Sequence, residues 1–270
     1  MTLATLTDVL KQDRAIAGLV VLGWEDARAF VEAADESGIP IVLQAGPGAR
    51  KYMPVAVLGK MFRHLAEQAR VPIVCHIDHA YTVQECIEGI DSGFTSVMID
   101  GSKKPILENI DLTQKVVALA KRAGVSVEGE VGEVGYTAGL ASAMTSPAEA
   151  EMFDRQSGAD ALAISIGNVH LNTEKTNGID FAHLSSIEDV TKLPLVLHGG
   201  SGIPDAVRRK LALETRVAKF NFGTELRMAF GKALRKSLED QPDSFDRIAL
   251  LSPTVAALRA ESMRIIKNIF

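Results

Sequence analysis

The sequence has little cysteine and no long apolar run. Its 270 residues include only two cysteines, Cys75 and Cys86, which are too few for a disulfide framework. No stretch is apolar over the roughly 20 residues that a membrane-spanning helix needs. The first residues also lack the basic start and apolar core of a secretion signal. We therefore expect reduced thiols, no membrane and a cytoplasmic location.

Runs of like charge and low-complexity segments are also absent from the sequence. The net charge of −5 argues against nucleic acid as a partner. Hydrophobic residues make up 47% of the chain and charged residues 23%, which suits a globular protein with a large buried core. No shift in composition marks a domain boundary, so we expect one catalytic domain over residues 1–270.

Short apolar runs alternate with amphipathic stretches along most of the chain. Eight runs predict buried strands: Ile16–Leu22, Pro40–Gln44, Pro72–Asp78, Ser96–Asp100, Ser126–Glu130, Ala161–Ile166, Pro194–His198 and Val217–Asn221. The helices predicted after them cover Trp24–Ser37, Val55–Arg70, Thr82–Ser92, Glu108–Ala123, Pro147–Ser157, Phe181–Asp189, Pro204–Leu213 and Thr224–Leu238.

Eight strand–helix units in about 250 residues are typical of an α/β protein of the (β/α)8 TIM-barrel type. We also expect a short N-terminal helix over Thr5–Lys11 and an extra C-terminal helix over Pro253–Ile269. A doubly wound open sheet is the main alternative, and the number of predicted strands favours the barrel.

The third predicted strand, Pro72–Asp78, ends in chemically capable side chains. Strand alternation places His76 and Asp78 on one face, and we expect His79 to follow where the strand opens into a loop. A single histidine here would more often be a core residue that caps the next helix. The carboxyl ends of barrel strands, however, carry the chemistry of this fold.

Similar polar residues stand at later strand ends. Asp100 ends the fourth strand and Glu130 the fifth, while His170 follows the sixth and His198 ends the seventh. In a barrel these ends converge on one mouth. Three imidazoles from different strands, with carboxylates nearby, can form a zinc site that keeps a position open for substrate.

A glycine-rich loop follows the seventh strand, in the sequence His198-Gly-Gly-Ser-Gly-Ile-Pro204. Its glycines let the backbone approach a ligand, and its N–H groups with the Ser201 hydroxyl can hold a phosphate. The phosphate site of many barrels lies after strands seven and eight, so the segment Asn221–Thr224 is expected to form its other wall. A plain glycine turn is the alternative.

These motifs together resemble those of the class II, zinc-dependent ketose-bisphosphate aldolases, the fructose- and tagatose-bisphosphate aldolases. They are HIDHA, MIDGSKKPILENI, VEGEVG, IGNVH, LVLHGGSGIP and KFNFGTEL, within about Ile39 to Arg227. The resemblance implies an aldehyde-lyase that reversibly cleaves a ketose phosphate or related polyhydroxy ketone into a dihydroxyacetone (phosphate)-type donor and an aldehyde. Cleavage beside a ketone leaves an enediolate, whose charge a chelated divalent cation stabilises.

The resemblance also implies a role for individual residues. Zinc, or another divalent cation, would be bound by His79, His170 and His198, and Asp78 would be the catalytic acid/base. Two further carboxylates would sit beside the metal, as supporting groups or alternative ligands: Asp100 and Glu130. The substrate and its phosphate would be held by Gln44, Gly199, Ser201, Asn221, Gly223 and Thr224.

Several positions depart from the pattern of that family. The loop Gly132–Ser142 lacks the family's acidic pair, and with its glycines we expect it to move over bound substrate. An apolar segment around Val20 replaces an asparagine, Gly46 stands where a serine often contacts the far phosphate, and Leu171 replaces a glycine. We therefore expect a ketose without the far phosphate to be preferred over fructose 1,6-bisphosphate.

Two other functions remain open at this point. One is a catalytically silent subunit that binds sugar phosphate or stabilises a partner aldolase, which the altered loop motivates. The other is a Schiff-base aldolase that uses Lys219 on the eighth strand. For the leading function we expect a small sugar or sugar-phosphate substrate, no nucleic acid, and a homodimer or homotetramer.

Overall fold

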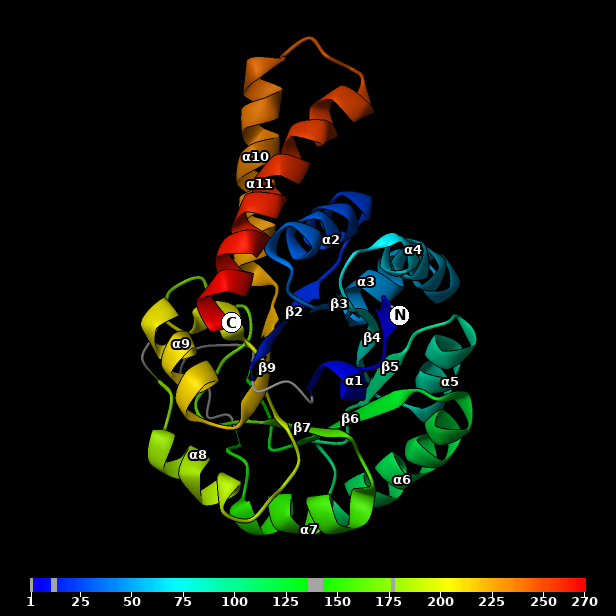
Figure 1. Ribbon diagram of the computed structural model, residues 1–270, viewed down its shortest axis with the longest axis vertical. Coiled ribbons are helices and arrows are strands. Elements are labelled where there is room, and N and C mark those ends of the chain that lie inside the picture. The colour runs from blue at the N-terminus through cyan, green and yellow to red at the C-terminus, as the bar shows by residue number, and fades with distance from the viewer. Residues whose placement is uncertain (1, 11–13, 136–142, 176–177) are drawn as a thin grey trace.

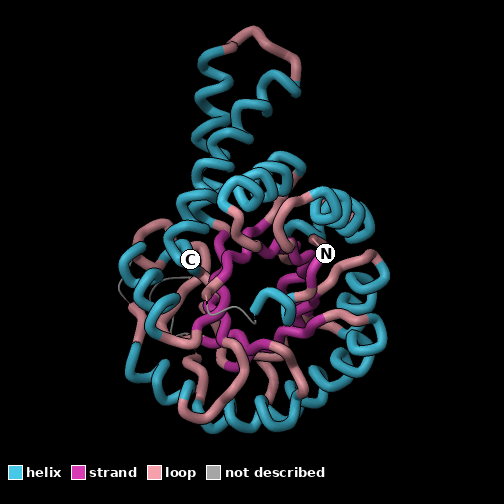
Figure 2. The backbone as a smooth tube through the Cα atoms, viewed as in Figure 1, coloured by secondary structure: helices cyan, strands magenta, loops and turns pink. Residues whose placement is uncertain are grey.

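Eight parallel strands form a closed barrel in the computed structural model, which describes residues 2–10, 14–135, 143–175 and 178–270 (Figure 2). Each strand pairs with the next one, and β9 pairs back with β2, which closes the barrel. The strands are β2 (Ile16–Val20), β3 (Ile41–Ala45), β4 (Ile73–Ala80), β5 (Ser96–Ile99), β6 (Ser126–Val131), β7 (Ala161–Ile164), β8 (Leu195–Leu197) and β9 (Val217–Phe222). The predicted (β/α)8 barrel is confirmed.

The helices surround this barrel (Figure 1). They are α2 (Trp24–Ser37), α4 (Val55–Gln68), α5 (Val83–Asp91), α6 (Ile106–Ala123), α7 (Pro147–Ser157), α8 (Phe181–Glu188), α9 (Asp205–Glu214) and α10 (Thr224–Asp240). Their apolar faces pack on the outside of the strands, which leaves the strands buried on both sides. Two helices, α2 and α7, have the predicted bounds.

The amino-terminal end of the barrel is closed by the short helix α1 (Leu6–Leu10), which was predicted as Thr5–Lys11. Its buried side chains Leu6, Val9 and Leu10 pack against the lower layer of the barrel interior. That layer contains Ile16, Val42, Val74, Met98, Ala161, Ala163 and Val196, which come from six of the eight barrel strands. The interior is therefore open at the carboxyl end, where the strand ends carry polar residues.

Three short elements were not predicted from the sequence. The strand β1 (Leu3–Ala4) pairs with β4 at Ile73 and Val74, just before the point where β5 begins to pair with β4. The helix α3 (Pro47–Tyr52) follows β3 directly, with Pro47 in its first turn. The 3-10 turn η1 (Gly200–Gly202) lies in the glycine-rich loop after β8.

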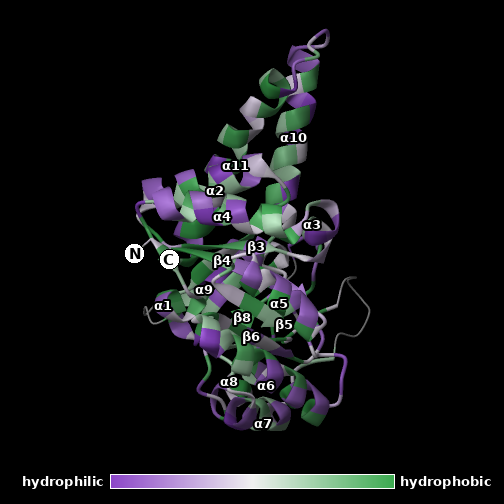
Figure 3. Cartoon of the chain, turned by 90° about the vertical axis from the view of Figure 1, so that its right-hand side faces the viewer, coloured by the Kyte–Doolittle hydropathy of each residue, from purple (hydrophilic) through white to green (hydrophobic). Residues whose placement is uncertain are grey.

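The last helix, α11 (Arg247–Ile269), begins earlier than the predicted start at Pro253. Asp246 caps it, since its carboxylate accepts a hydrogen bond from the Ile248 N–H at 2.8 Å, and Pro253 lies inside the helix. The helices α10 and α11 pack on each other and project beyond the barrel as a helical arm (Figures 1 and 3). Across the described ranges, we find no helix with the length and apolar character to cross a bilayer.

The predicted movement of the loop Gly132–Ser142 concerns residues 136–142, which lie outside the described residues. The flanking part is described. Glu133 there is half-buried and pairs with Lys103, with 3.4 Å between the carboxylate and the ammonium nitrogen.

Candidate functional site

Three histidines meet inside the mouth of the barrel. His79 lies on β4, His170 follows β7 and His198 directly follows β8. Their ligand atoms all lie within 4.8 Å of one another, and Nδ1 of His198 is 2.8 Å from Nε2 of His79. Three imidazole nitrogens aimed at one point are a donor set suited to zinc, with a fourth position left for substrate.

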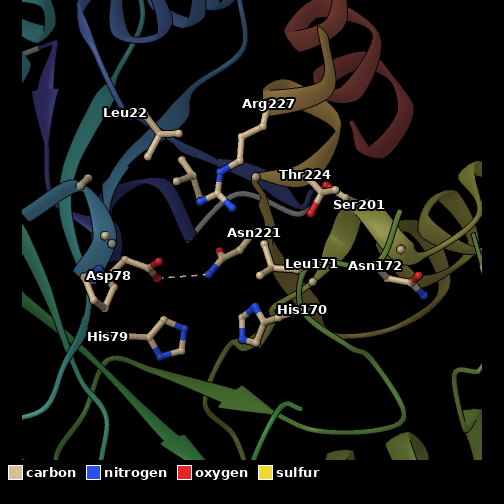
Figure 4. A pocket seen from close by; sticks show the side chains of 18 of the residues that line it. Leu22, Asp78, His79, His170, Leu171, Asn172, Ser201, Asn221, Thr224 and Arg227 are labelled. Atoms are coloured by element: carbon tan, nitrogen blue, oxygen red, sulfur yellow. Dashed lines mark hydrogen bonds between the residues drawn. The ribbon is translucent and has the colours of Figure 1, made fainter. Parts of the chain in front are cut away.

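The position of His79 differs from the prediction. The expectation that His79 follows the end of the strand is wrong, because β4 continues to Ala80. The register of β4 against β5 shifts between Ile77 and Ala80, and His79 has a φ of +50°, in the left-handed region. This irregularity turns His79 toward the mouth beside its neighbour Asp78, and both side chains line the same pocket (Figure 4).

Carboxylates support the histidines on the nitrogens that face away from the meeting point. Nδ1 of His79 lies 2.9 Å from Oδ2 of Asp100 and 3.5 Å from Oε2 of Glu130. His79, Asp100 and Glu130 also form a second group in which the ligand atoms are within 4.8 Å of one another. Carboxylate partners of this kind orient metal-binding imidazoles and increase their basicity.

Glu128 supports His198 in the same way and was not predicted. Its Oε1 lies 3.2 Å from Nε2 of His198, and its Oε2 accepts a hydrogen bond from the ammonium group of Lys219 at 2.7 Å. All three side chains are fully buried beneath the site. The alternation in Glu128-Gly129-Glu130 was the available signal, because it places both carboxylates on the inner face of β6.

Burial and the carboxylates move the pKa values of the imidazoles apart. For His79 burial lowers the pKa, but the charges of Asp78, Asp100 and Glu130 outweigh it and raise the pKa to about 9. Burial lowers the pKa of His170 to about 4 and that of His198 well below its usual value. Two of the three imidazoles are thus neutral at pH 7, the form that binds a metal ion.

The pKa values of the two neighbouring carboxyl groups, Glu130 and Asp100, are shifted in opposite directions. Burial raises the pKa of Glu130 to about 8. Burial also acts to raise the pKa of Asp100, but hydrogen bonds from His79 and Ser102 outweigh it and lower the pKa to about 2. The region around the three histidines therefore holds one firmly ionised carboxylate, Asp100, and one, Glu130, that takes up a proton near neutral pH.

Asp78 is oriented by two amide side chains. Nε2 of Gln44 donates to its Oδ1 at 2.9 Å. Nδ2 of Asn221 approaches the same oxygen at 3.5 Å, as Figure 4 shows. The other oxygen, Oδ2, lies toward Gly46, where an added Cβ would be 3.4 Å away. Since Gly46 lines the pocket, Oδ2 is the oxygen on the substrate side.

Gln44, which was predicted to bind substrate, lies behind the pocket lining and contacts Asp78. Gln44 is fully buried, and in the part of the chain that the structure describes it is not among the residues that line the pocket. It faces Gly18, where an added Cβ would approach its side-chain oxygen to 1.9 Å. Gln44 therefore acts on Asp78, and the absence of a side chain at Gly18 makes room for it.

The predicted phosphate loops form one wall of the pocket. Gly199, Ser201, Asn221, Gly223 and Thr224 all line it, together with Asp78, His79 and His170. Gly199 has a φ of +69°, and an added Cβ would meet the Val169 carbonyl oxygen at 2.2 Å. The N-terminus of α10 adds backbone N–H groups and the positive end of its dipole to this wall, which favours an anion.

Arg208, which sequence reasoning missed, ties the two phosphate loops together. Its fully buried guanidinium donates to the carbonyl oxygens of Ile203 at 2.6 Å and Ser201 at 3.3 Å. It also donates to Oε1 of Glu225 at 2.7 Å, and the Glu225 N–H donates to the Ser201 hydroxyl at 3.2 Å. The loop after β8 is thus fixed to the first turn of α10.

The rest of the pocket lining is mostly apolar. It includes Val20, Leu22 and Gly46, while Leu171 lies on the side of the predicted phosphate loops and Arg227 reaches in from α10 (Figure 4). Leu171 has a φ of +53°, a left-handed conformation that explains why glycine suits this position. Arg227 was missed from the sequence, although its place three residues after Thr224 puts it on the same face of the helix.

The comparisons with known proteins agree with this geometry. Residues 1–270 match the family described as fructose-bisphosphate aldolase class-II. A fructose-bisphosphate aldolase of Geobacillus stearothermophilus is 36% identical over 263 residues, which cover 94% of this chain and 91% of that protein. A 6-phospho-5-dehydro-2-deoxy-D-gluconate aldolase of Shouchella clausii is 35% identical over 271 residues, which cover 97% of this chain and 92% of that protein. The crystal structure of the YdjI aldolase from Escherichia coli K12 has a TM-score of 0.85 at 28% identity, over 99% of this chain and 97% of that one.

Proposed function

Because the chain belongs to the class II fructose-bisphosphate aldolase family, and is thus a metal-dependent carbon–carbon lyase, we propose that it cleaves a ketose phosphate at the mouth of its barrel. In this proposal His79, His170 and His198 bind a divalent cation, with zinc the first choice, and Asp78 is the acid/base. The observation that carries the proposal is the meeting of three imidazoles from three strand ends beside one oriented carboxylate.

Each part of the site has a task in this reaction. The cation, when bound, stabilises the negative charge that develops on the oxygens of the donor half. Asp78 takes the proton of the hydroxyl group at the bond that breaks, through Oδ2, while Gln44 and Asn221 hold its Oδ1. The donor phosphate is held by Gly199, Ser201 and the N-terminus of α10. This fixes the reacting hydroxyl group of the substrate at the distance from Asp78 that proton transfer needs.

Family membership supports an active aldolase over the catalytically silent subunit. The retained acid beside the metal-binding group points the same way, because a subunit that only binds has no need of it. The Schiff-base alternative with Lys219 is disfavoured by burial. Lys219 is fully buried, its ammonium group is paired with Glu128, and it is not among the described residues of the pocket.

Borohydride trapping separates the metal mechanism from the Schiff-base mechanism. We expect no stable covalent adduct when the enzyme is reduced with sodium borohydride in the presence of dihydroxyacetone phosphate, because the Lys219 amine is paired with Glu128 and lies out of reach. Mass spectrometry of the intact protein measures this, with a lysine-dependent aldolase as the positive control. An added mass that disappears in Lys219→Arg would establish the Schiff base instead.

We further propose that the substrate carries one phosphate, on the donor half. Outside the phosphate loops the pocket wall offers Val20, Leu22 and Gly46, with Arg227 as its cation. A phosphate dianion in a partly dry pocket needs several donors, whereas one guanidinium matches a carboxylate in a bidentate pair. A far end that is neutral or a carboxylate therefore suits this wall better than a second phosphate. The gluconate aldolase among the relatives is named for a substrate of that class.

Substrate preference tests this second proposal directly. We expect kcat/KM for fructose 1,6-bisphosphate to be lower than for ketose 1-phosphates and for 6-phospho-5-dehydro-2-deoxygluconate, since each missing donor costs a far phosphate roughly 1–3 kcal/mol. Retro-aldol assays with metal analysis of the same sample provide the measurement. A preference of about tenfold or more for the bisphosphate contradicts the proposal.

The variant Arg227→Met sharpens the comparison. It should lower kcat/KM about tenfold or more for a substrate with a far carboxylate, and leave a ketose 1-phosphate with a neutral far end close to the parent value. The neutral substrate is the internal control, because both substrates share the donor half. An equal loss for both substrates would contradict a role at the far end and assign Arg227 to the donor half or to the fold.

The homodimer or homotetramer and the cytoplasmic location stay predictions. The arm of α10 and α11 supports self-association, because it carries apolar side chains that are highly exposed in the single chain, among them Phe245 at 98% and Ile248 at 76%. Exposed aromatic and aliphatic residues on a projecting element are typical of a surface that another subunit covers.

A further inference from the structure

We propose that Arg50 is a positioning residue, whose guanidinium group holds the end of β4 in the conformation that turns both Asp78 and His79 into the site. The inference rests on the proposed function, in which Asp78 is the acid/base and His79 a metal ligand. Arg50 lies on α3 (Pro47–Tyr52), the short helix between β3 and α4.

The site poses a geometric problem that a regular strand does not solve. Consecutive side chains of a strand point to opposite faces, so Asp78 and His79 would lie on different sides of the barrel wall. Between the paired positions Ile77↔Val97 and Ala80↔Ile99, β4 has one residue more than β5, which is a β-bulge. The bulge and the left-handed backbone of His79 bring both side chains to the inner face.

Arg50 binds the backbone at this bulge. Its Nη1 donates to the Asp78 carbonyl oxygen at 2.5 Å, and its Nη2 donates to the His79 carbonyl oxygen at 2.9 Å. Nη1 also donates to the carbonyl oxygen of Ala45, the last residue of β3, at 2.6 Å. One guanidinium group therefore fixes both peptide units of the bulge and joins them to the neighbouring strand.

The side chain of Arg50 is suited to holding the bulge, and its burial leaves it little access to substrate. It is only 9% exposed, and among the described residues it is not part of the pocket lining, so it acts on Asp78 and His79 through the backbone. Glu85 balances its charge at 3.7 Å and also accepts a hydrogen bond from the Tyr81 N–H at 2.6 Å. The planar fork of arginine reaches three carbonyl groups at once, which the single ammonium group of lysine does not.

The backbone of His79 explains why such a clamp is needed. A residue other than glycine adopts a left-handed conformation at a cost, and it persists only where its surroundings fix it. The His79 N–H adds little to hold it, since the partner it reaches is the thioether sulfur of Met98 at 3.4 Å. Charge-assisted bonds to the carbonyl groups of residues 78 and 79 therefore supply the restraint.

Cobalt binding tests the proposal without any assay of turnover. Metal-free parent protein, Arg50→Met, Arg50→Lys and the matched control Lys51→Met, an exposed cation next to Arg50 in the sequence, are titrated with Co²⁺ and followed by visible absorption. We expect Arg50→Met to weaken Co²⁺ binding about 10–100-fold and to change the absorption spectrum, the range found when groups that orient metal ligands are lost. The Co²⁺ affinity of Arg50→Lys should lie between those of Arg50→Met and the parent, and be at least about threefold weaker than that of the parent. The Co²⁺ affinity of Lys51→Met should equal that of the parent.

Hydrogen exchange in the metal-free proteins provides the second readout. We expect the amides of residues 79–81 to exchange faster in Arg50→Met and Arg50→Lys than in the parent and in Lys51→Met, because the bulge loses its restraint. Parent-like Co²⁺ affinity, spectrum and exchange in a folded Arg50→Met overturn the inference. If that variant does not fold, a parent-like Arg50→Lys overturns it equally. A parent protein that binds no Co²⁺ contradicts the proposed metal site, while the exchange rates still decide the role of Arg50.

Discussion

Removal of the metal ion is expected to abolish aldol cleavage, and zinc is expected to restore it. The cation provides several kcal/mol of charge stabilisation in the transition state, so metal-free protein should turn over at least about a thousandfold more slowly. The measurement is kcat after dialysis against a chelator and again after addition of one equivalent of Zn²⁺, with the metal content determined at both stages. Full activity in protein free of metal would contradict the proposed mechanism.

A histidine variant connects this result to the three proposed ligands. His198→Ala should lose both bound metal and activity, because it removes one of three imidazoles that meet at one point. His64→Ala, an exposed histidine on α4, is the matched control and should keep both. A His198→Ala protein with parent-like metal content would show that the ion is bound elsewhere.

Asp78→Asn is expected to keep the metal and lose most of the turnover. A positioned acid/base contributes about 10²–10⁴-fold to the rate, and asparagine preserves the shape but exchanges no proton. The effect should appear in kcat, with the metal content and the thermal midpoint close to those of the parent. Asp111→Asn, at an exposed carboxylate on α6, is the control. Turnover of Asp78→Asn within about threefold of the parent would assign the proton transfer to another group.

The geometry around Asp78 allows the Asp78→Asn experiment to separate chemistry from packing. Asparagine at position 78 retains an oxygen that can accept the hydrogen bond which Gln44 now donates to Oδ1 at 2.9 Å. The exchange therefore removes an ionisable oxygen on the pocket side and little else. Loss of activity with an unchanged fold and metal content then reports on chemistry, which a larger substitution would not separate from packing.

Much of the fold was predictable because the barrel repeats one local pattern. Buried runs such as Val217–Asn221 and amphipathic stretches such as Trp24–Ser37 carry their periodicity in the sequence, and their structural bounds agree closely. The three histidines were predictable for the same reason. Once the strands are counted, their carboxyl ends must converge, and polar residues at those ends must meet.

The remaining features depend on contacts between distant segments. The hydrogen bond from Gln44 to Asp78, which is 34 residues away in the sequence, was not predicted. Glu128 and Arg208 contribute through partners on other elements, which no local pattern identifies. The bulge at His79 likewise arises from pairing with β5 and from Arg50, so local alternation alone places His79 incorrectly.

The helix that closes the bottom of the barrel has a consequence for the order of folding. Residues 6–10 of α1 pack on a layer built from β2, β3, β4, β5, β7 and β8. That binding surface exists only when these strands stand side by side, although residues 6–10 are synthesised before any of them. The helix must therefore wait, as a solvated segment, until the chain has been made through β8. Its docking therefore belongs to the last stages of folding, when it closes the amino-terminal end of the barrel.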